Sequence, residues 1–177
     1  SLGSLSLWLY EESYLLRGRV GEWDEELAGP MVIGFDSVEY LFYDGVDSEG
    51  NGSIGVATSV DGVNFGRKND GEPALSLDGV RLSDPYVIYD APRDEWRMFF
   101  SIFDGVEWSI GHASSADLLS WEVDPAPVLQ IDDNGVQVSI AAPVVTHVHG
   151  EFRMWASVEI DEGWAIGFAT STDGVDW

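Results

Sequence analysis

One short motif recurs three times in this chain at a constant spacing, and this repeat limits what the chain can fold into. The motif Ile-Gly-x-Ala-Ser/Thr-Ser begins at residues 54, 110 and 166, so the three copies are evenly spaced along the chain. Each copy leads into an aspartate-containing turn and then an aromatic residue, namely Phe65, Trp121 and Trp177. A unit of this length that recurs in register predicts an architecture of stacked repeats.

Each unit has the pattern of four short β-strands. Two apolar runs precede the motif, and the first of them begins at a proline: Pro30, Pro85 and Pro143. The runs are rich in Val, Ile, Phe, Tyr and Trp, and glycine or Asp-Gly turns separate them, as is typical of hairpins. A four-stranded unit that repeats at this length predicts an all-β chain of β-propeller blades.

The register predicts three blades in one partial propeller domain that spans residues 1–177. Trp8 lies as far before Pro30 as Trp121 lies before Pro143. Residues 1–8 therefore read as the end of a preceding unit, and the repeats fall at about 9–64, 65–120 and 121–177. The aromatic residue that ends each unit is predicted to pack between neighbouring blades.

Charge narrows the range of partners. The chain has 32 acidic and 8 basic residues, a formal net charge of −24. Such a surface repels nucleic acid phosphates and anionic membranes, so we expect neither as a partner, whereas a neutral polysaccharide is compatible with it. The acidity fits either a salty environment or bound calcium. The absence of cysteine excludes disulfides and thiolate metal sites.

Three stretches of the second unit carry a family resemblance. Residues 83–90, 96–101 and 110–121 resemble the blades of the five-bladed propeller glycosidases, the β-fructosidases and arabinanases or xylosidases of glycoside hydrolase families 32 and 43. The resemblance implies a carbohydrate ligand and no cofactor. It also implies that an aspartate in an Asp-Pro pair faces a central funnel, and Asp84 matches that position.

Only one of the three units carries an acid at this position, because Gly29 and Ala142 precede the corresponding prolines. A functional site superposed on a repeat would produce this asymmetry, and so would a single solvent-facing aspartate at a turn. Arg81, three residues upstream, is a candidate to orient the carboxylate or a substrate hydroxyl, or else a surface arginine.

Glycoside hydrolysis needs two carboxyl groups on either side of the scissile bond. The resemblance implies a glutamate acid just before Pro143, but residues 138–142 contain no glutamate. Glu159 is a weaker candidate for the second carboxyl group, so the sequence leaves open whether the chain is an enzyme. Trp108 and Trp164, next to the loops expected to rim the funnel, are candidates to stack on sugar rings or to pack between strands.

Metal sites are not predicted. His147 and His149 are two residues apart, which could place both on one face of a strand, but a polar hairpin turn is the favoured interpretation. Residues 44–52 alternate oxygen-bearing side chains in the manner of a calcium loop, yet they lack its full spacing, and a solvated hairpin loop is favoured. His112 takes the place of Val56 and Phe168 in the repeat and is read as a packing residue.

The function predicted from the sequence is a glycosidase-like propeller segment that binds or hydrolyses a neutral glycan. Three blades are too few to close a ring, so two arrangements are open. Either the chain lacks blades of a longer five-bladed enzyme, or two copies associate head to tail into a six-bladed ring. In the second case the alternative function is that of a non-catalytic homodimer, a binding or assembly module.

Overall fold

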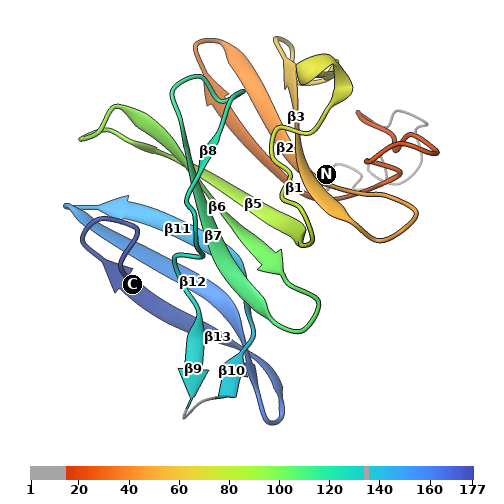
Figure 1. Ribbon diagram of the computed structural model, residues 1–177. Coiled ribbons are helices and arrows are strands. Elements are labelled where there is room, and N and C mark those ends of the chain that lie inside the picture. The colour runs from red at the N-terminus through yellow and green to blue at the C-terminus, as the bar shows by residue number, and fades with distance from the viewer. Residues whose placement is uncertain (1–14, 134–135) are drawn as a thin grey trace, which may run out of the picture.

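The computed structural model of the protein, which describes residues 15–133 and 136–177, consists of antiparallel β-sheets (Figure 1). The first sheet has the order β1-β2-β3-β4 and the second has the order β5-β6-β7-β8. The third sheet contains β11-β12-β13, and β9 and β10 form a separate hairpin. A short 3-10 turn covers Asn69–Gly71, and within the described residues no helix is long and apolar enough to cross a membrane.

The strands follow the repeat of the sequence. The bounds of the first sheet are Glu26–Phe35 (β1), Val38–Val46 (β2), Gly52–Ser59 (β3) and Gly66–Arg67 (β4). Those of the second are Arg81–Asp90 (β5), Glu95–Phe103 (β6), Trp108–Ser115 (β7) and Glu122–Val123 (β8). The hairpin comprises Ile131–Asp133 (β9) and Val136–Val138 (β10), and the third sheet Ile140–Val148 (β11), Glu151–Ile160 (β12) and Gly163–Ser171 (β13).

This arrangement confirms the all-β prediction and differs from it in two respects. The third sheet has three strands in the described part of the chain, because the positions that match β4 and β8 in the repeat fall after Trp177. The β9–β10 hairpin was not expected, because its short apolar runs lie in the connection between two units and lack the repeat motif.

Apolar side chains hold the sheets against one another. Phe42, Ile54 and Val56 of the first sheet pack with Met98 and Phe100 of the second in one buried cluster. Other residues of the second sheet pack with the third in another cluster: Phe99 and Ile110 against Val145, Phe152 and Met154. Burying such side chains is the main favourable term in folding, so the repeat is stable only when its sheets stack.

Two of the three aromatic residues that end the units contribute to these contacts, as predicted, whereas Phe65 packs against Leu41, Tyr43 and Ala57 of its own sheet. Trp121 lies edge-on to Phe42 of the preceding sheet, with 5.7 Å between ring centroids. Trp177 lies edge-on to Phe99 at 5.8 Å. The two aromatic pairs are equivalent in the repeat, because Phe42 and Phe99 hold the same position in their middle strands.

The turn after each third strand is closed by a serine and an aspartate. The serine hydroxyl accepts hydrogen bonds from the amides two and three residues further on, and the aspartate Oδ1 accepts from the amides two and three residues beyond itself. The three pairs are Ser59 and Asp61, Ser115 and Asp117, and Ser171 and Asp173. These bonds satisfy the turn, which explains the repeated Ser-x-Asp sequence structurally.

Because the aspartates of these turns accept hydrogen bonds in their ionised form, we expect the protein to lose stability in acid. These hydrogen bonds lower the pKa of the Asp61 and Asp117 carboxyls, and they lower the pKa of Asp173 to about 2. A carboxyl whose pKa is lowered by folding stabilises the protein above its unfolded value of about 4, and this stability is lost as the pH falls toward the folded value. We expect Asp173→Asn to lower the thermal midpoint at pH 7 and to match the wild type near pH 2. Midpoints that differ equally at both pH values would contradict this origin.

Candidate functional site

One backbone geometry recurs in the first strand of each sheet, at the predicted Asp-Pro position. The strand pairing shifts register between Ala28 and Met31, between Ser83 and Tyr86, and between Ala141 and Val144. Each shift contains one of the three prolines, which has no amide hydrogen to donate to the ladder. The residue before the proline adopts a left-handed conformation in every sheet, with φ of 53° at Gly29, 52° at Asp84 and 54° at Ala142.

The left-handed residue donates its amide to the neighbouring sheet. The Asp84 amide donates to Asp44 Oδ1 of the first sheet at 2.8 Å. The Ala142 amide donates to Ser101 Oγ of the second sheet, also at 2.8 Å. Asp44 and Ser101 are equivalent, because each lies opposite the isoleucine of the repeat motif, Ile54 or Ile110. The break in the ladder therefore provides a hydrogen bond between adjacent sheets.

Asp84 is the centre of the hydrogen bonds at this place. Its Oδ2 accepts from Ser101 Oγ at 2.9 Å and from Ser83 Oγ at 3.1 Å. Ser101 thus joins the amide of the third sheet to the carboxylate of the second. The side chain is half-buried, so the sequence-predicted acid lies between sheets rather than at a free turn.

Asp44 is a functional candidate that the sequence reasoning missed. Its side chain is buried, with the residue 4% exposed, and burial raises the pKa of Asp44 to about 6, helped by the negative charge of Asp84. The hydrogen bond from the Asp84 amide and the charge of Arg81 lower the same pKa in part. The available signal was an aspartate at the position where the other units have Ser101 and Ser157.

Gly29 makes room for the Asp44 carboxyl group. A Cβ atom at Gly29 would lie 2.7 Å from both carboxylate oxygens of Asp44, and real Cβ contacts are not that short. A side chain at residue 29 and the observed position of the Asp44 carboxyl group therefore exclude each other. The first sheet carries its acid, Asp44, on its second strand, β2. The second sheet carries its acid, Asp84, on its first strand, β5.

Arg81 is the first residue of β5, and its charge acts on Asp44. Its side chain lies against the first residue of β3, since a Cβ atom at Gly52 would meet Arg81 Cγ at 2.5 Å. Its Nε is buried and has no hydrogen-bond partner among the described residues. Arg81 therefore acts on the site through its charge, which favours the ionised form of Asp44.

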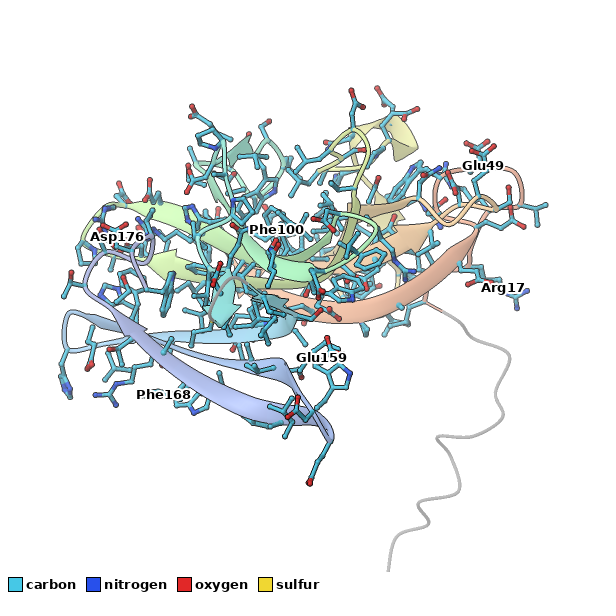
Figure 2. The ribbon with its side chains drawn as sticks, turned by 60° about the horizontal axis from the view of Figure 1, so that its bottom comes forward. Arg17, Glu49, Phe100, Glu159, Phe168 and Asp176 are labelled. Atoms are coloured by element: carbon cyan, nitrogen blue, oxygen red, sulfur yellow. The ribbon has the colours of Figure 1, made fainter. Side chains whose placement is uncertain are left out.

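Glu159 is not brought into contact with Asp84. It lies near the end of β12, at the same end of the sheets where β5 begins, as Figure 2 shows from below. It lines a cavity of about 820 Å³ together with Glu107, Asp132 and Asp161. No contact in the described part of the chain joins Glu159 to Asp84 or Asp44.

Both tryptophans lie at the beginning of a third strand, next to the loop that precedes it. Trp108 is the first residue of β7 and packs against Phe103, with ring centroids 4.9 Å apart. Trp164 lies in β13 opposite Glu159, and it is exposed. Trp164 is therefore the more accessible of the two, because Trp108 is half-buried.

The side chains of His147, His112 and the acidic loop after β2 contact other groups of the protein. His147 lies in β11, stacks on Phe152 and has its Nδ1 3.4 Å from Oδ1 of the buried Asp90. The prediction that His147 lies in a hairpin turn is therefore wrong. His112 is buried, and its Nδ1 lies 2.9 Å from Asp124 Oδ2. The loop after β2 is closed by Asp47, which accepts from the amides of residues 49 and 51. No group of three metal-ligating side chains occurs in residues 15–133 and 136–177.

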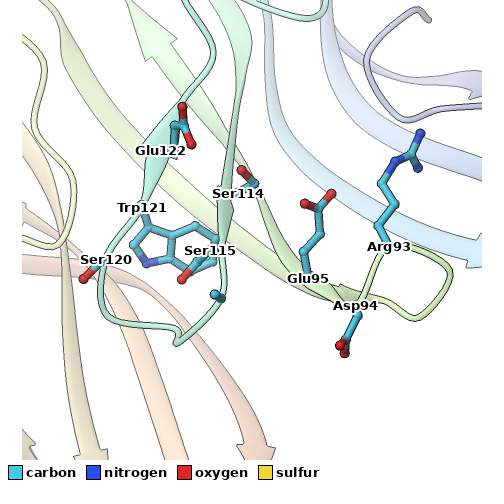
Figure 3. Close-up of a pocket in the computed structure, with 9 residues that line it drawn as sticks. Arg93, Asp94, Glu95, Ser114, Ser115, Ser120, Trp121 and Glu122 are labelled. Atoms are coloured by element: carbon cyan, nitrogen blue, oxygen red, sulfur yellow. The ribbon is translucent and has the colours of Figure 1, made fainter.

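A separate pocket of about 520 Å³ lies at the opposite end of the second sheet (Figure 3). It is lined by the β5–β6 turn and by the turn before β8, including Arg93, Glu95 and Trp121. Glu95 is paired there with Arg97 at 3.2 Å. The pocket contains none of the predicted site residues, so we place the candidate site at Asp84 and Asp44.

Known proteins share this fold. No protein-family profile matches the chain. An extracellular exo-inulinase of Meyerozyma guilliermondii is 25% identical over 112 residues, which cover 56% of this chain and 21% of the relative. An endo-arabinase of Bacteroides thetaiotaomicron has a TM-score of 0.74 and 19% identity, over 92% of this chain and 63% of that one.

A thermostable family-43 glycoside hydrolase superposes with a TM-score of 0.71 and 20% identity, over 85% of this chain and 52% of that one. The chain thus spans about a fifth of the curated relative and between half and two thirds of these solved structures. The fold of this chain is that of the β-propeller glycosidases of the family-43 type.

Proposed function

We propose that this chain binds a neutral glycan where Asp84 of the second sheet meets Asp44 of the first, with Asp84 as the carboxylate that contacts the ligand. The observation that carries the proposal is the coupled pair of Asp84 and Asp44, held by an amide–carboxylate hydrogen bond of 2.8 Å between two sheets. Carboxylates bind sugar hydroxyl groups by charge-assisted hydrogen bonds, which are stronger than neutral ones. The net charge of −24 disfavours an anionic glycan.

Hydrolysis is the second candidate function, and the pKa of Asp44 favours it. A glycosidase uses one protonated and one ionised carboxyl group, whose environments push their pKa values apart. A pKa of about 6 keeps part of Asp44 protonated in weakly acidic solution. In this function Asp44 is the acid and Asp84 the base or the group that stabilises developing positive charge.

The three sheets are proposed to be three consecutive blades of one partial propeller domain, residues 1–177, with units at about 9–64, 65–120 and 121–177. The supporting observation is that the left-handed residue, the Ser-x-Asp turn and the terminal aromatic recur at the same positions of each unit. The segment before residue 15, assigned to a preceding unit and to the start of the first, lies outside the described residues.

Two polysaccharides test the proposal, because similar proteins are an endo-arabinase and an exo-inulinase. We expect affinity electrophoresis in gels that contain arabinan or inulin to retard the protein, with at least one of the two giving retardation. Release of reducing ends in the same mixtures would support hydrolysis, and retardation without release would support binding alone. No retardation and no release with either polysaccharide would overturn both functions.

A further inference from the structure

The hydroxyl group of Ser101 lies between the third sheet and the candidate site. Ser101 belongs to the middle strand of the second sheet and is 0% exposed. Its Oγ accepts a hydrogen bond from the Ala142 amide of the third sheet and donates one to Asp84 Oδ2. A serine hydroxyl has a single proton, and an amide can only donate. The one proton of Ser101 is therefore directed at the Asp84 carboxylate.

The two oxygens of that carboxylate have different surroundings. Oδ2 accepts from Ser101 Oγ at 2.9 Å and from Ser83 Oγ at 3.1 Å, so the protein occupies both of its lone-pair positions. Oδ1 has no hydrogen-bond partner among the described residues, and it is not one of their buried unpartnered atoms. Oδ1 of Asp84 is therefore the oxygen that a ligand can reach.

Of the two hydroxyl donors, Ser101 is the one that fixes the carboxylate relative to the rest of the protein. Ser83 precedes Asp84 in β5, so its hydroxyl moves with the same strand. Ser101 lies in β6 and is also bonded to β11 through the Ala142 amide. Both hydroxyls are buried, and hydrogen bonds are electrostatically stronger in such surroundings than in water. The bond from Ser101 therefore holds Asp84 against three strands of two sheets.

The equivalent positions of the repeat show why a hydroxyl is needed at residue 101. Opposite the repeat isoleucine the three sheets carry Asp44, Ser101 and Ser157, and their left-handed residues are Gly29, Asp84 and Ala142. Asp44 accepts an amide as Ser101 does, but an ionised aspartate has no proton to donate. The first sheet needs no such donor, because Gly29 has no side chain. The second sheet needs one, because its left-handed residue is an acid.

We propose that Ser101 is a positioning residue of the glycan site, which holds the Asp84 carboxylate in one rotamer with Oδ1 facing the ligand. The third sheet takes part in the site through the Ala142 amide, which directs the Ser101 proton toward Asp84. The functional part of this inference rests on the proposed glycan binding. The orientation of Asp84 exists with or without a glycan and is tested separately.

The rotamer of Asp84 can be measured by NMR in the absence of a glycan. Three-bond couplings across its Cα–Cβ bond distinguish one staggered rotamer from an average over several. We expect a single rotamer in the wild type and averaged couplings in Ser101→Ala, because the variant lacks the bond from β6. Ser157→Ala, the same change at the equivalent position of the third sheet, should leave the Asp84 couplings unchanged. Couplings that are the same in the wild type and Ser101→Ala would overturn the proposal.

Glycan binding tests the consequence for the site. We expect Ser101→Ala to bind arabinan or inulin about 3-fold to 10-fold more weakly than the wild type, because a free carboxylate is divided among three staggered rotamers. The measurement is the dissociation constant from affinity electrophoresis. Ser157→Ala is the matched control and should bind as the wild type does. Equal losses in Ser101→Ala and Ser157→Ala would overturn a specific role for Ser101.

A double-mutant cycle separates positioning from a purely structural role. Asp84→Ala gives the second sheet the left-handed alanine that the third sheet has at Ala142, with φ of 54°. If Ser101 acts through the Asp84 carboxylate, adding Ser101→Ala to Asp84→Ala should change the dissociation constant by less than about twofold. The same loss in both backgrounds would overturn the proposal, because Ser101 would then affect binding without Asp84.

The failure of this inference can be distinguished from the failure of the proposed function. If Asp84→Asn weakens glycan binding and Ser101→Ala does not, the positioning role is overturned and the proposed function stands. If Ser101→Ala gives averaged couplings and neither polysaccharide retards the wild type, the orientation of Asp84 by Ser101 is confirmed and glycan binding is overturned.

Discussion

The Asp84→Asn variant is expected to bind arabinan or inulin about 10-fold to 100-fold more weakly than the wild-type chain. The substitution keeps the size of the side chain and one acceptor oxygen for Ser101 and Ser83, but it removes the charge. Hydrogen bonds to a charged group contribute about 1.5–3 kcal/mol, which corresponds to this range of affinity. The measurement is the dissociation constant from affinity electrophoresis over a series of polysaccharide concentrations.

Asp36→Asn is the matched control for this loss. Asp36 is also an aspartate with left-handed backbone, with φ of 49°, but it is exposed in the β1–β2 turn at the opposite end of the first sheet. Its replacement should leave glycan binding unchanged. If Asp84→Asn and Asp36→Asn both bind as the wild type does, the Asp84 carboxylate does not contact the ligand and the proposed site is wrong.

The Asp44→Asn variant is expected to be more stable than the wild type above pH 7, by about 3 kcal/mol. Burial and the charge of Asp84 raise the pKa of Asp44 from 3.8 to about 6. An acid whose pKa is raised by folding favours the folded state at low pH. The wild type therefore loses this stability as the pH rises from about 4 through 6. Asparagine keeps the acceptor for the Asp84 amide without the buried charge.

Urea unfolding at pH 4 and at pH 8 measures this effect. The free energies of unfolding of wild type and Asp44→Asn should agree near pH 4 and diverge as the pH rises. Asp84→Asn should reduce the pH dependence of the wild type, because it removes the negative charge that raises the pKa of Asp44. Parallel pH profiles for wild type and Asp44→Asn would show that Asp44 is not a perturbed acid.

Much of the fold could be predicted because its determinants are local or periodic. The motif at 54, 110 and 166 identified three units, and β-branched and aromatic runs between turn residues identified their strands. The β9–β10 hairpin could not be predicted in this way, because it belongs to no repeat. The left-handed conformation at Asp84 was also not predictable, since the residue before a proline is normally extended.

The site was half predictable for a related reason. Asp84 was identifiable because it precedes Pro85 where the other units have Gly29 and Ala142. Asp44 belongs to a different strand and a different sheet, and only the stacking of the sheets brings its carboxyl group to the Asp84 amide. Sequence spacing carries no information about such a contact, and Asp44 by itself resembled the first residue of a polar loop.

The left-handed position separates the joining of the sheets from the chemistry of the chain. At Asp84 and Ala142 the backbone amide of that residue makes the bond to the preceding sheet, so this bond forms whether the side chain is that of aspartate or of alanine. A repeat protein built this way can gain, lose or relocate an acid near its axis by one substitution without rebuilding its architecture. Proteins of this kind can therefore differ in activity while their backbones are the same, so a similar fold does not imply a similar activity here.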